Sequence, residues 1–273
     1  MHNFSVLMSI YSKENARYFD RAMTSIWDEQ TVKPSEIILV EDGKLTDDLY
    51  SSISQWKEKI GSAFRTIPLK KNCGLGMALN IGLKECGYDL IARMDTDDIA
   101  RFDRFERQLS IFTNTNIDVC SSWLSEFDKN EFEIISYRKL PKEHLDIVSF
   151  SRKRNPVNHP AVMFKKNSVI GAGGYKHMPW FEDYYLWTRM ILNNSKFFNI
   201  QEPLVNMRVG LEQIKRRSGF EYALSEVKFQ KFLLNKGFIN KSYFYSVGLV
   251  KFFFRISPKF LVTLVYRQLR RFD

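Results

Sequence analysis

The 273-residue chain has few cysteines, no long apolar run and no internal repeat, and each absence excludes a class of protein. Its three cysteines, Cys73, Cys86 and Cys120, are too few and too scattered for a disulfide framework or a thiolate metal site, and they fit a reducing compartment. No run of about eighteen apolar residues is free of charge, so we expect no membrane-spanning helix. The first residues have no basic segment before their short apolar run, so we expect no secretory signal peptide.

The composition, 44% hydrophobic and 26% charged, is that of a globular protein rather than a disordered chain, a collagen or a coiled coil. The net charge of +10 is concentrated at one end. Residues 204–273 contain 14 Lys and Arg against 4 Asp and Glu, whereas the rest of the chain contains 27 of each. A balanced body with a basic end indicates a region directed at a surface. We find no helix-turn-helix, zinc-finger or aromatic RNA-binding signature, so nucleic acid is not an expected partner.

The first half alternates short β-rich apolar runs with segments of helical periodicity. Strands are predicted at residues 4–10, 36–41, 64–69 and 89–94, and helices at residues 14–29, after residue 74 and after residue 98. This alternation predicts right-handed βαβ units and a parallel sheet, whose ligands bind at the carboxyl ends of the strands. Residues 117–205 are less regular, and we expect mixed strands and loops that complete the sheet.

An acidic run, Asp95-Thr96-Asp97-Asp98, directly follows the fourth predicted strand. Three carboxylates within four residues repel one another unless a cation neutralises them. Oxygen ligands of this kind suit Mg²⁺ or Mn²⁺, and Mg²⁺ often shares its coordination shell with substrate phosphates. A helix N-cap is the alternative interpretation, but one aspartate would suffice for it. The acidic run therefore predicts a divalent metal ion.

Two further acidic positions each have a structural alternative. Asp42, in Glu41-Asp42-Gly43 at the end of the second predicted strand, could accept hydrogen bonds from a base or a ribose. In isolation, an ordinary Asp-Gly turn is the better interpretation. Glu182 and Asp183 could supply a general base that deprotonates a hydroxyl, or could stabilise a helix N-terminus.

In their order and spacing, the motifs resemble those of the inverting nucleotide-sugar glycosyltransferases of family 2, which have the GT-A fold. The resemblance covers about residues 4–220 and lies in FSVLMSIYSKEN, SIWDEQTVKPSEIILVEDG, NCGLGMALNIGL, LIARMDTDDIARFDRFERQ, NPVNHPAVMF and GGYKHMPWFEDYYLWTRM. It is strongest to bacterial members that build capsule, exopolysaccharide and O-antigen repeat units. It implies an α/β, Rossmann-like, mostly parallel sheet flanked by helices, with a catalytic domain at residues 1–218 and a helical, basic region at residues 219–273.

The resemblance also implies a donor side. Asp42 would contact the uracil, although the family usually has a second aspartate where this chain has Glu41. Asp95 and Asp97 would hold the ribose and the metal ion, with Asp97 as the direct ligand and Asp98 assisting. Guanidinium groups suit phosphate oxygens, but a solvated basic loop is the alternative for Arg216 and Arg217. The remaining residues expected on this side are Ser9, Tyr11, Asn80, Arg208 and Gln213.

On the acceptor side, the resemblance makes Asp183 the catalytic base, a role that usually requires a pKa raised by partial burial. Glu182, Trp180 and His159 would face the acceptor, although a lone histidine is more often structural. Aromatic residues around this acidic pair could form apolar walls and stack on sugar rings: Trp180, Phe181, Tyr184, Tyr185 and Trp187.

The basic region mixes aromatic residues with Lys and Arg, and Pro258 is expected to divide two helices. Such a pattern fits an interfacial helix on an anionic membrane surface. The alternative is a helical pair packed on the catalytic domain with solvated charges.

Together these features predict a metal-dependent hexosyltransferase, with Mn²⁺ or Mg²⁺. It would move a hexose or N-acetylhexosamine, with glucose or galactose in β-linkage preferred, from a UDP-sugar to an undecaprenyl-diphosphate-linked sugar. Its expected location is the cytoplasm, peripheral on the inner face of the cytoplasmic membrane. Two alternatives are a GT-A-like nucleotidyltransferase, whose glycine- and lysine-rich N-terminal loop is absent, and a non-catalytic membrane-binding protein.

Overall fold

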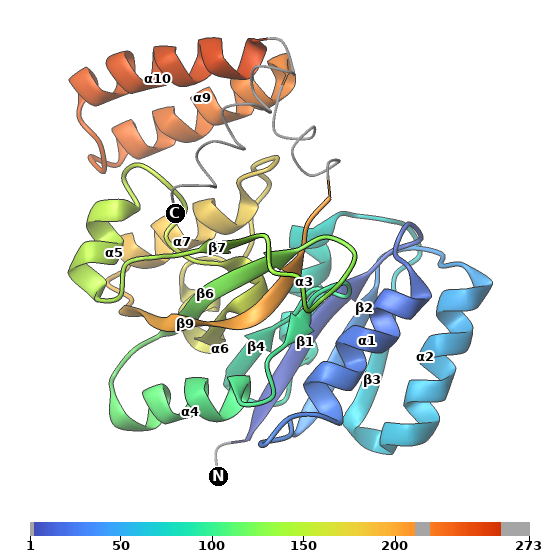
Figure 1. Ribbon diagram of the computed structural model, residues 1–273. Helices are drawn as coiled ribbons and strands as arrows, with labels where there is room; N and C mark the ends of the chain where they lie inside the picture. Colours follow the sequence, from blue (N-terminus) through green and yellow to red (C-terminus); the bar gives the residue numbers. More distant parts are fainter. Residues whose placement is uncertain (1–2, 211–218, 258–273) are drawn as a thin grey trace.

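A computed structural model describes residues 3–210 and 219–257 of the chain. Its centre is a sheet of strand order β3-β2-β1-β4-β8-β6-β9-β5, with β7 paired to β6 (Figure 1). The first four strands are parallel and confirm the predicted βαβ units. These strands are β1 (Phe4–Ile10), β2 (Glu36–Glu41), β3 (Phe64–Pro68) and β4 (Leu90–Arg93), and the helices between them are α1 (Ala16–Trp27), α2 (Asp47–Ile60) and α3 (Leu75–Glu85).

The second half completes the sheet with mixed pairing, as expected for residues 117–205. Strand β8 is antiparallel to both β4 and β6, while β6 and β9 are parallel. The strands are β5 (Ile99–Ala100), β6 (Val119–Phe127), β7 (Ser136–Arg138), β8 (Met163–Lys165) and β9 (Phe197–Arg208). The helices are α4 (Arg104–Asn114), α5 (His144–Phe150), α6 (Lys166–Gly171) and α7 (Glu182–Leu192).

Helices cover both faces of the sheet, so its central strands are buried on both sides. Alternate residues of β1 show this: Val6 and Met8 pack with α1, α2 and α4, whereas Leu7 packs with α3 on the other face. A strand buried on both faces reads as a continuous apolar run, which is why these strands were evident in the sequence. The carboxyl ends of β1, β2 and β4 are thereby held at one edge of a rigid core.

Two details of the helices differ from the sequence prediction. Residues 47–60, for which no element is predicted, form α2 behind the N-cap Thr46. The helix predicted after residue 98 begins only at Arg104, so Phe102 lies before α4 and is 59% exposed.

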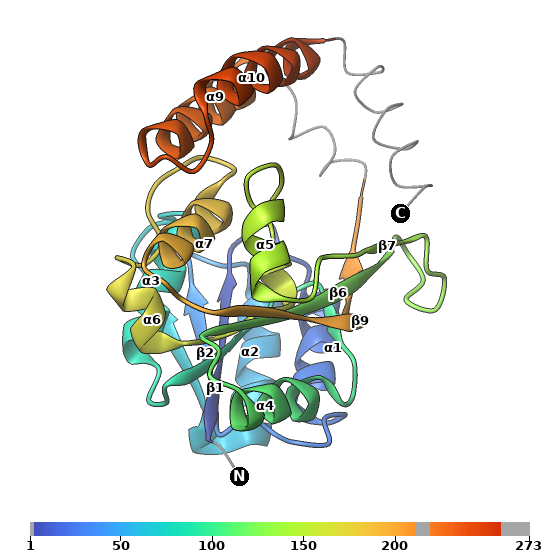
Figure 2. The same ribbon diagram turned by 90° about the vertical axis from the view of Figure 1, so that its left-hand side faces the viewer.

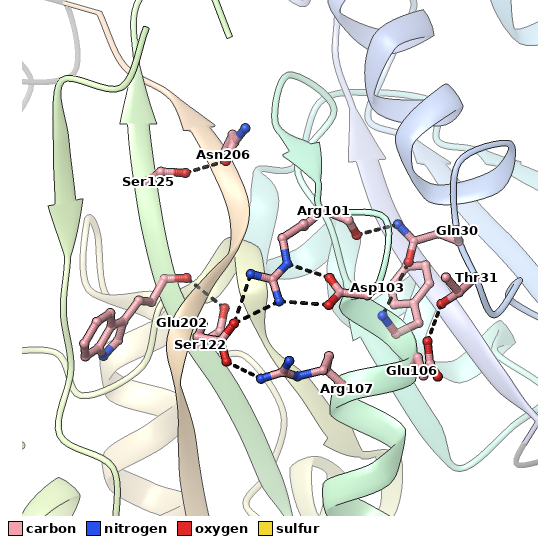
Figure 3. Close-up of polar contacts among 12 residues, drawn as sticks. Gln30, Thr31, Arg101, Asp103, Glu106, Arg107, Ser122, Ser125, Glu202 and Asn206 are labelled. Atoms are coloured by element: carbon pink, nitrogen blue, oxygen red, sulfur yellow. Dashed lines mark hydrogen bonds and ion pairs between the residues drawn. The ribbon is translucent and has the colours of Figure 1, made fainter. Parts of the chain in front are cut away.

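Ion pairs hold the segment that follows the acidic run (Figure 3). Arg101 donates to both carboxylate oxygens of Asp103, at 2.5 and 2.9 Å, and to Glu202 of β9 at 3.2 Å. Glu202 also pairs with Arg107 of α4, and Gln30 donates to the Arg101 carbonyl at 2.8 Å. Such partly exposed pairs stabilise little individually, about 0.2–1 kcal/mol each. As a network they fix β5 between α4 and β9.

The C-terminal elements are a helical pair, α9 (Phe220–Asn235) and α10 (Lys241–Ile256). Both views show the pair lying over α7 (Figures 1 and 2). Phe229 of α9 packs against Phe181 and Tyr184, with ring centroids 5.5 and 4.5 Å away. Helix α9 therefore shares a core with α7, and a domain boundary at residues 218/219 stays a prediction. Pro258 and the residues after it lie outside the described residues.

No helix in the part of the chain that the structure describes combines the length and the hydropathy needed to cross a membrane.

The close packing of α3 on the sheet can be tested at Gly82. A Cβ atom there would lie 2.5 Å from Leu7 Cδ1 and 2.6 Å from Val40 Cγ2. We expect Gly82→Ala to lower the free energy of unfolding by about 1–3 kcal/mol, because overpacking outweighs the better helix propensity of alanine. Urea unfolding measures this change. Gly171→Ala is the matched control, since nothing lies within 4 Å of a Cβ at Gly171. Equal stability of the two variants would contradict the close approach.

Candidate active site

Three strand ends bring the predicted site residues to one edge of the sheet. Ser9 and Tyr11 lie at the end of β1, and both are half-buried. Asp42 follows β2, whose last residue pairs with Ile10. Asp95 follows β4, which lies on the other side of β1. This is the edge at which parallel α/β sheets bind ligands.

Protein cations already neutralise part of the acidic run. Arg93, the last residue of β4, is 2% exposed and donates from Nη1 to Asp95 Oδ2 at 2.6 Å and from Nη2 to Asp95 Oδ1. Arg208, the last residue of β9, donates from its backbone N–H to Asp98 Oδ1 at 2.8 Å and from Nε to the Asp97 carbonyl at 3.2 Å. Arg93 therefore supplies one cation that offsets the acidic run, and a divalent metal ion there stays a prediction.

Asp97 remains the carboxylate best suited to a metal ion. Among the described residues, no other side chain donates a hydrogen bond to it, whereas Asp95 and Asp98 are both engaged. Burial and the neighbouring charge of Asp95 raise the pKa of Asp97 to about 6, and burial with the charges of Asp95 and Asp97 raises the pKa of Asp98 well above its ordinary value. Within the described ranges, no three His, Cys, Asp or Glu side chains are placed to hold a metal ion. An ion at Asp97 could share its coordination shell with phosphate oxygens of a substrate.

Asp42 has a structural role that we did not predict. Its carboxylate accepts hydrogen bonds from the backbone N–H groups of Cys73 at 2.7 Å and Gly74 at 3.0 Å. Gly43 makes the turn beside it with φ of 89°, and a Cβ there would lie 2.7 Å from the Asn72 backbone nitrogen. Asp42 thereby fixes the loop that starts α3, and its contact with uracil stays a prediction.

Asn80 joins α3 to the turn before α7. Its amide donates to the Tyr175 carbonyl at 2.7 Å and accepts from the Tyr175 backbone N–H at 2.8 Å. Gly174 permits this contact, because a Cβ there would lie 2.6 Å from Asn80 Oδ1. The bonds described for the Asn80 amide are therefore structural, and its expected role in lining a donor pocket stays a prediction.

Arg208 is held beside the acidic run by aromatic rings. Its guanidinium carbon lies 3.8 Å from the ring centroid of Tyr18 and 4.6 Å from that of Phe127. Cation–π contacts of this kind restrict the orientation of the side chain. The other residues predicted near a diphosphate, Gln213, Arg216 and Arg217, lie outside the described residues.

Asp183 is half-buried in the first turn of α7. Burial raises its pKa above the ordinary value. The effect is partly offset by the Tyr184 backbone N–H, 2.7 Å from Oδ1, and by the Asn155 amide, 2.7 Å from Oδ2. A carboxylate with a raised pKa can serve as a general base near neutral pH. Sequence reasoning missed Asn155, although it lies only three residues before the Asn-His-Pro motif.

Glu182 and Trp180 flank Asp183 at the start of α7. Glu182 is half-buried, and its Cγ would lie 3.6 Å from a Cβ at Gly76, so the N-terminal turns of α7 and α3 are adjacent. Burial raises the pKa of Glu182 as well. Trp180 has a left-handed backbone with φ of 65°, is 44% exposed and lies 5.5 Å from the Tyr222 ring. The contact of Glu182 and Trp180 with an acceptor stays a prediction.

His159 is bonded inside the protein. Its Nε2 lies 2.8 Å from the Tyr175 hydroxyl, and its ring centroid is 6.0 Å from that of Trp187. Burial and the charge of Arg93 lower the pKa of His159 well below its usual range, so the ring is neutral at physiological pH. These contacts favour the structural alternative for His159, and its predicted role in acceptor binding stays a prediction.

The donor-side and acceptor-side groups belong to one cluster. The Tyr175 phenol lies in the electrostatic field of both Asp95 and Asp183. The charge of Arg93 likewise lowers the pKa of Asp97 and of Asp183. The acidic run and the raised-pKa aspartate therefore share surroundings, as a metal-assisted group transfer between two bound molecules would require.

Comparison with known proteins agrees with this arrangement. The model of the family "Glycosyl transferase family 2" matches residues 5–171. The chain is 39% identical, over 98% of its length and 97% of the relative's, to the "UDP-Gal:alpha-D-GlcNAc-diphosphoundecaprenol beta-1,3-galactosyltransferase" of Escherichia coli. It is 34% identical, over 98% of its length and 99% of the relative's, to the "Amylovoran biosynthesis glycosyltransferase AmsE" of Erwinia amylovora.

Among solved structures, the fold resembles S. aureus TarS with a TM-score of 0.64 at 16% identity. The superposition covers 93% of this chain and 43% of TarS, so the chain spans less than half of that protein. At this identity the likeness concerns the fold alone, and it confirms the expected GT-A architecture. The family match and the full-length relatives establish more: the chain belongs to glycosyl transferase family 2.

Proposed function

We propose that the protein transfers a hexose, with galactose or glucose preferred, from a UDP-sugar to the sugar of a diphosphoundecaprenol-linked acceptor. The substrate classes are those in the name of the E. coli relative, which matches nearly the whole chain. The observation that carries the proposal is the position of Asp183, a half-buried carboxylate in the same electrostatic cluster as the acidic run. AmsE, whose name assigns it to amylovoran biosynthesis, also matches nearly the whole chain and supports a biosynthetic transfer of this kind.

In the proposed reaction, Asp183 takes the proton of the acceptor hydroxyl while that oxygen attacks the anomeric carbon. Asn155 orients the Asp183 carboxylate through its amide. Attack opposite the departing UDP inverts the configuration, so an α-linked donor gives a β-linked product. Arg208, fixed beside the acidic run, is placed to stabilise charge on the leaving diphosphate.

Asp97 would hold Mn²⁺ or Mg²⁺, since no other described side chain donates a hydrogen bond to its carboxylate. The ion, when bound, would supply positive charge to the diphosphate oxygens. Both carboxylate oxygens of Asp95 already accept hydrogen bonds from Arg93. Asp95 would therefore accept hydrogen bonds from the ribose and would not bind the metal ion through both oxygens. Family membership favours this function over the nucleotidyltransferase and the non-catalytic alternatives.

The base is tested with Asp183→Asn. The amide keeps the shape of the side chain but cannot take a proton, so we expect transfer to fall by about 10²–10⁴-fold. The assay uses UDP-galactose or UDP-glucose with a synthetic GlcNAc-diphosphate-lipid, and NMR identifies the product linkage.

UDP binding, measured by calorimetry, should be unchanged in Asp183→Asn. The matched control is Asp146→Asn, which neutralises an exposed acid in the first turn of α5. If Asp183→Asn transfers sugar at the rate of this control, another group acts as the base.

Metal dependence is tested with Asp97→Asn. Because Asp97 is the proposed ligand, we expect the variant to lose the gain in UDP affinity that Mn²⁺ gives the unaltered protein. We expect EDTA to weaken UDP binding by the unaltered protein about as much as the substitution does. Titrations of UDP with and without MnCl₂ measure both effects, and an Mn²⁺-dependent gain of normal size in Asp97→Asn would rule out this ligand.

The outer face of α9 and α10 supports the proposed contact with an anionic membrane. Leu224, Lys228 and Lys231 are exposed along α9, and Tyr245 and Val250 are exposed on α10. Exposed basic and apolar side chains on one helical pair suit the interface of an anionic bilayer. This proposal would place the protein at the inner face of the cytoplasmic membrane, where lipid-linked acceptors are made.

Two basic residues of α10, Lys251 and Arg255, do not face outward and cannot contact a membrane. Arg255 donates to Glu226 of α9 at 2.8 Å, and Lys251 pairs with the same carboxylate at 3.4 Å. Glu226 is 5% exposed, so these two cations hold α10 on α9 instead of facing outward. Lys251 and Arg255 are therefore not among the cations proposed to face the membrane.

The membrane proposal predicts that Lys228→Glu/Lys231→Glu weakens binding to anionic vesicles. Each cation near such a surface contributes about 1 kcal/mol, so reversing two charges should lower the partition coefficient by more than about tenfold. Co-sedimentation with phosphatidylglycerol vesicles measures binding, with phosphatidylcholine vesicles for comparison. Lys57→Glu/Lys129→Glu makes the same charge change on the body of the protein, where both lysines are exposed. If the two double variants bind phosphatidylglycerol vesicles equally, the helical pair does not contact the membrane and its role is structural.

A further inference from the structure

Arg93 takes no direct part in the proposed chemistry, yet it bonds to Asp95, which does. It is the last residue of β4, a strand paired on both sides within the sheet, and its side chain is 2% exposed. The other residues of β4 are apolar: Leu90, Ile91 and Ala92. Burying a guanidinium at such a position costs free energy unless an opposite charge and hydrogen bonds compensate for the lost water.

The contacts of Arg93 account for only part of its hydrogen-bonding capacity. Its two terminal nitrogens form a fork on the Asp95 carboxylate. Its Nε, which is fully buried, has no hydrogen-bond partner. Paired forks fix the plane and direction of a carboxylate better than a single bond does. The pair thus holds Asp95 in one orientation at the edge where a ligand would bind.

The charge of Arg93 also acts on groups from several elements. It lowers the pKa of Asp97, Asp98 and Asp183, and it disfavours protonation of His159. Asp97 belongs to the acidic run after β4, and Asp183 belongs to α7. The charge of Arg93 thus acts on both the proposed metal ligand and the proposed base.

We propose that Arg93 is a positioning residue for the donor side of the active site. Its fork holds the Asp95 carboxylate in the orientation that meets the nucleotide. This inference rests on the proposed function, because it assigns Arg93 an effect on the binding of the UDP-sugar. Loss of the fork weakens donor binding, and loss of the fork together with the charge weakens it further.

Two substitutions separate these effects. Arg93→Lys keeps the charge but cannot form the fork, so the KM for the UDP-sugar should rise about tenfold with kcat within about threefold. Arg93→Gln removes the charge as well and leaves Asp95 without its cation, so the KM should rise by about a hundredfold. Steady-state kinetics at saturating acceptor give both constants.

A double-mutant cycle tests the pairing with Asp95. We expect Arg93→Gln/Asp95→Asn to bind UDP no more weakly than the worse single variant, because two partners of one contact give non-additive losses. Additive losses in UDP calorimetry would overturn the pairing. If Arg93→Gln does not fold, the same cycle is run with Arg93→Lys and Asp95→Asn.

Arg104 provides the matched control for a purely structural arginine. It is fully buried and donates hydrogen bonds to the Arg93 carbonyl, Gln108 and Met94, and no hydrogen bond joins it to a carboxylate in the described part of the chain. Arg104→Lys should lower the thermal unfolding temperature without separating KM from kcat. If the Arg93 variants lose activity only in proportion to stability, as Arg104→Lys does, Arg93 is structural and the inference is wrong. If the unaltered protein transfers no sugar from any UDP-sugar, the proposed function itself fails.

Discussion

The pairing of Arg93 with Asp95 is the interaction on which the site depends. Three carboxylates stand at the end of a buried strand, where repulsion and desolvation both disfavour their charged forms. The protein offsets this with a guanidinium in the strand itself and with the backbone and side chain of Arg208, 110 residues away from Asp98. Burial and the neighbouring carboxylates still raise the pKa of both Asp97 and Asp98. Asp98 accepts a hydrogen bond from the Arg208 backbone, whereas no other described side chain donates one to Asp97. The compensation is therefore uneven, which leaves one carboxylate prepared for an external cation.

A series of hydrogen bonds and packing contacts connects Asp42 on the donor side with α7 on the acceptor side. Asp42 binds the loop that begins α3, and Asn80 in that helix binds both backbone groups of Tyr175. Tyr175 in turn bonds to His159, which packs against Trp187 of α7. The same helix presents Asp183. Because each contact joins packed elements, the distance between Asp42 and Asp183 is set by the core and not by the loops alone.

The sequence predicted the parts of this site that local patterns encode. The first four strands were evident because both of their faces are buried, and the acidic run and Asp183 were evident from motifs. Pairings between distant segments were not, such as Arg208 with Asp98, Asn155 with Asp183 and the insertion of antiparallel β8 between β4 and β6. Arg93 had a signal that we missed, since a cation ends an apolar strand two residues before Asp95. The metal ion was predicted from the acidic run itself, whereas the residue-by-residue donor and acceptor contacts were inferred from the family resemblance.

The helical pair α9 and α10 joins the surface proposed to contact a membrane to the helix that carries Asp183. Helix α9 packs its aromatic residues on Phe181 and Tyr184, which flank Glu182 and Asp183 at the start of α7. Glu226 ties α10 to α9 from the buried side, so the pair is stiff where it meets the core. A surface bound by the outer face of this pair would therefore lie at a fixed orientation to Asp183. For an acceptor carried on a lipid diphosphate, that orientation limits which sugar hydroxyl can approach the base.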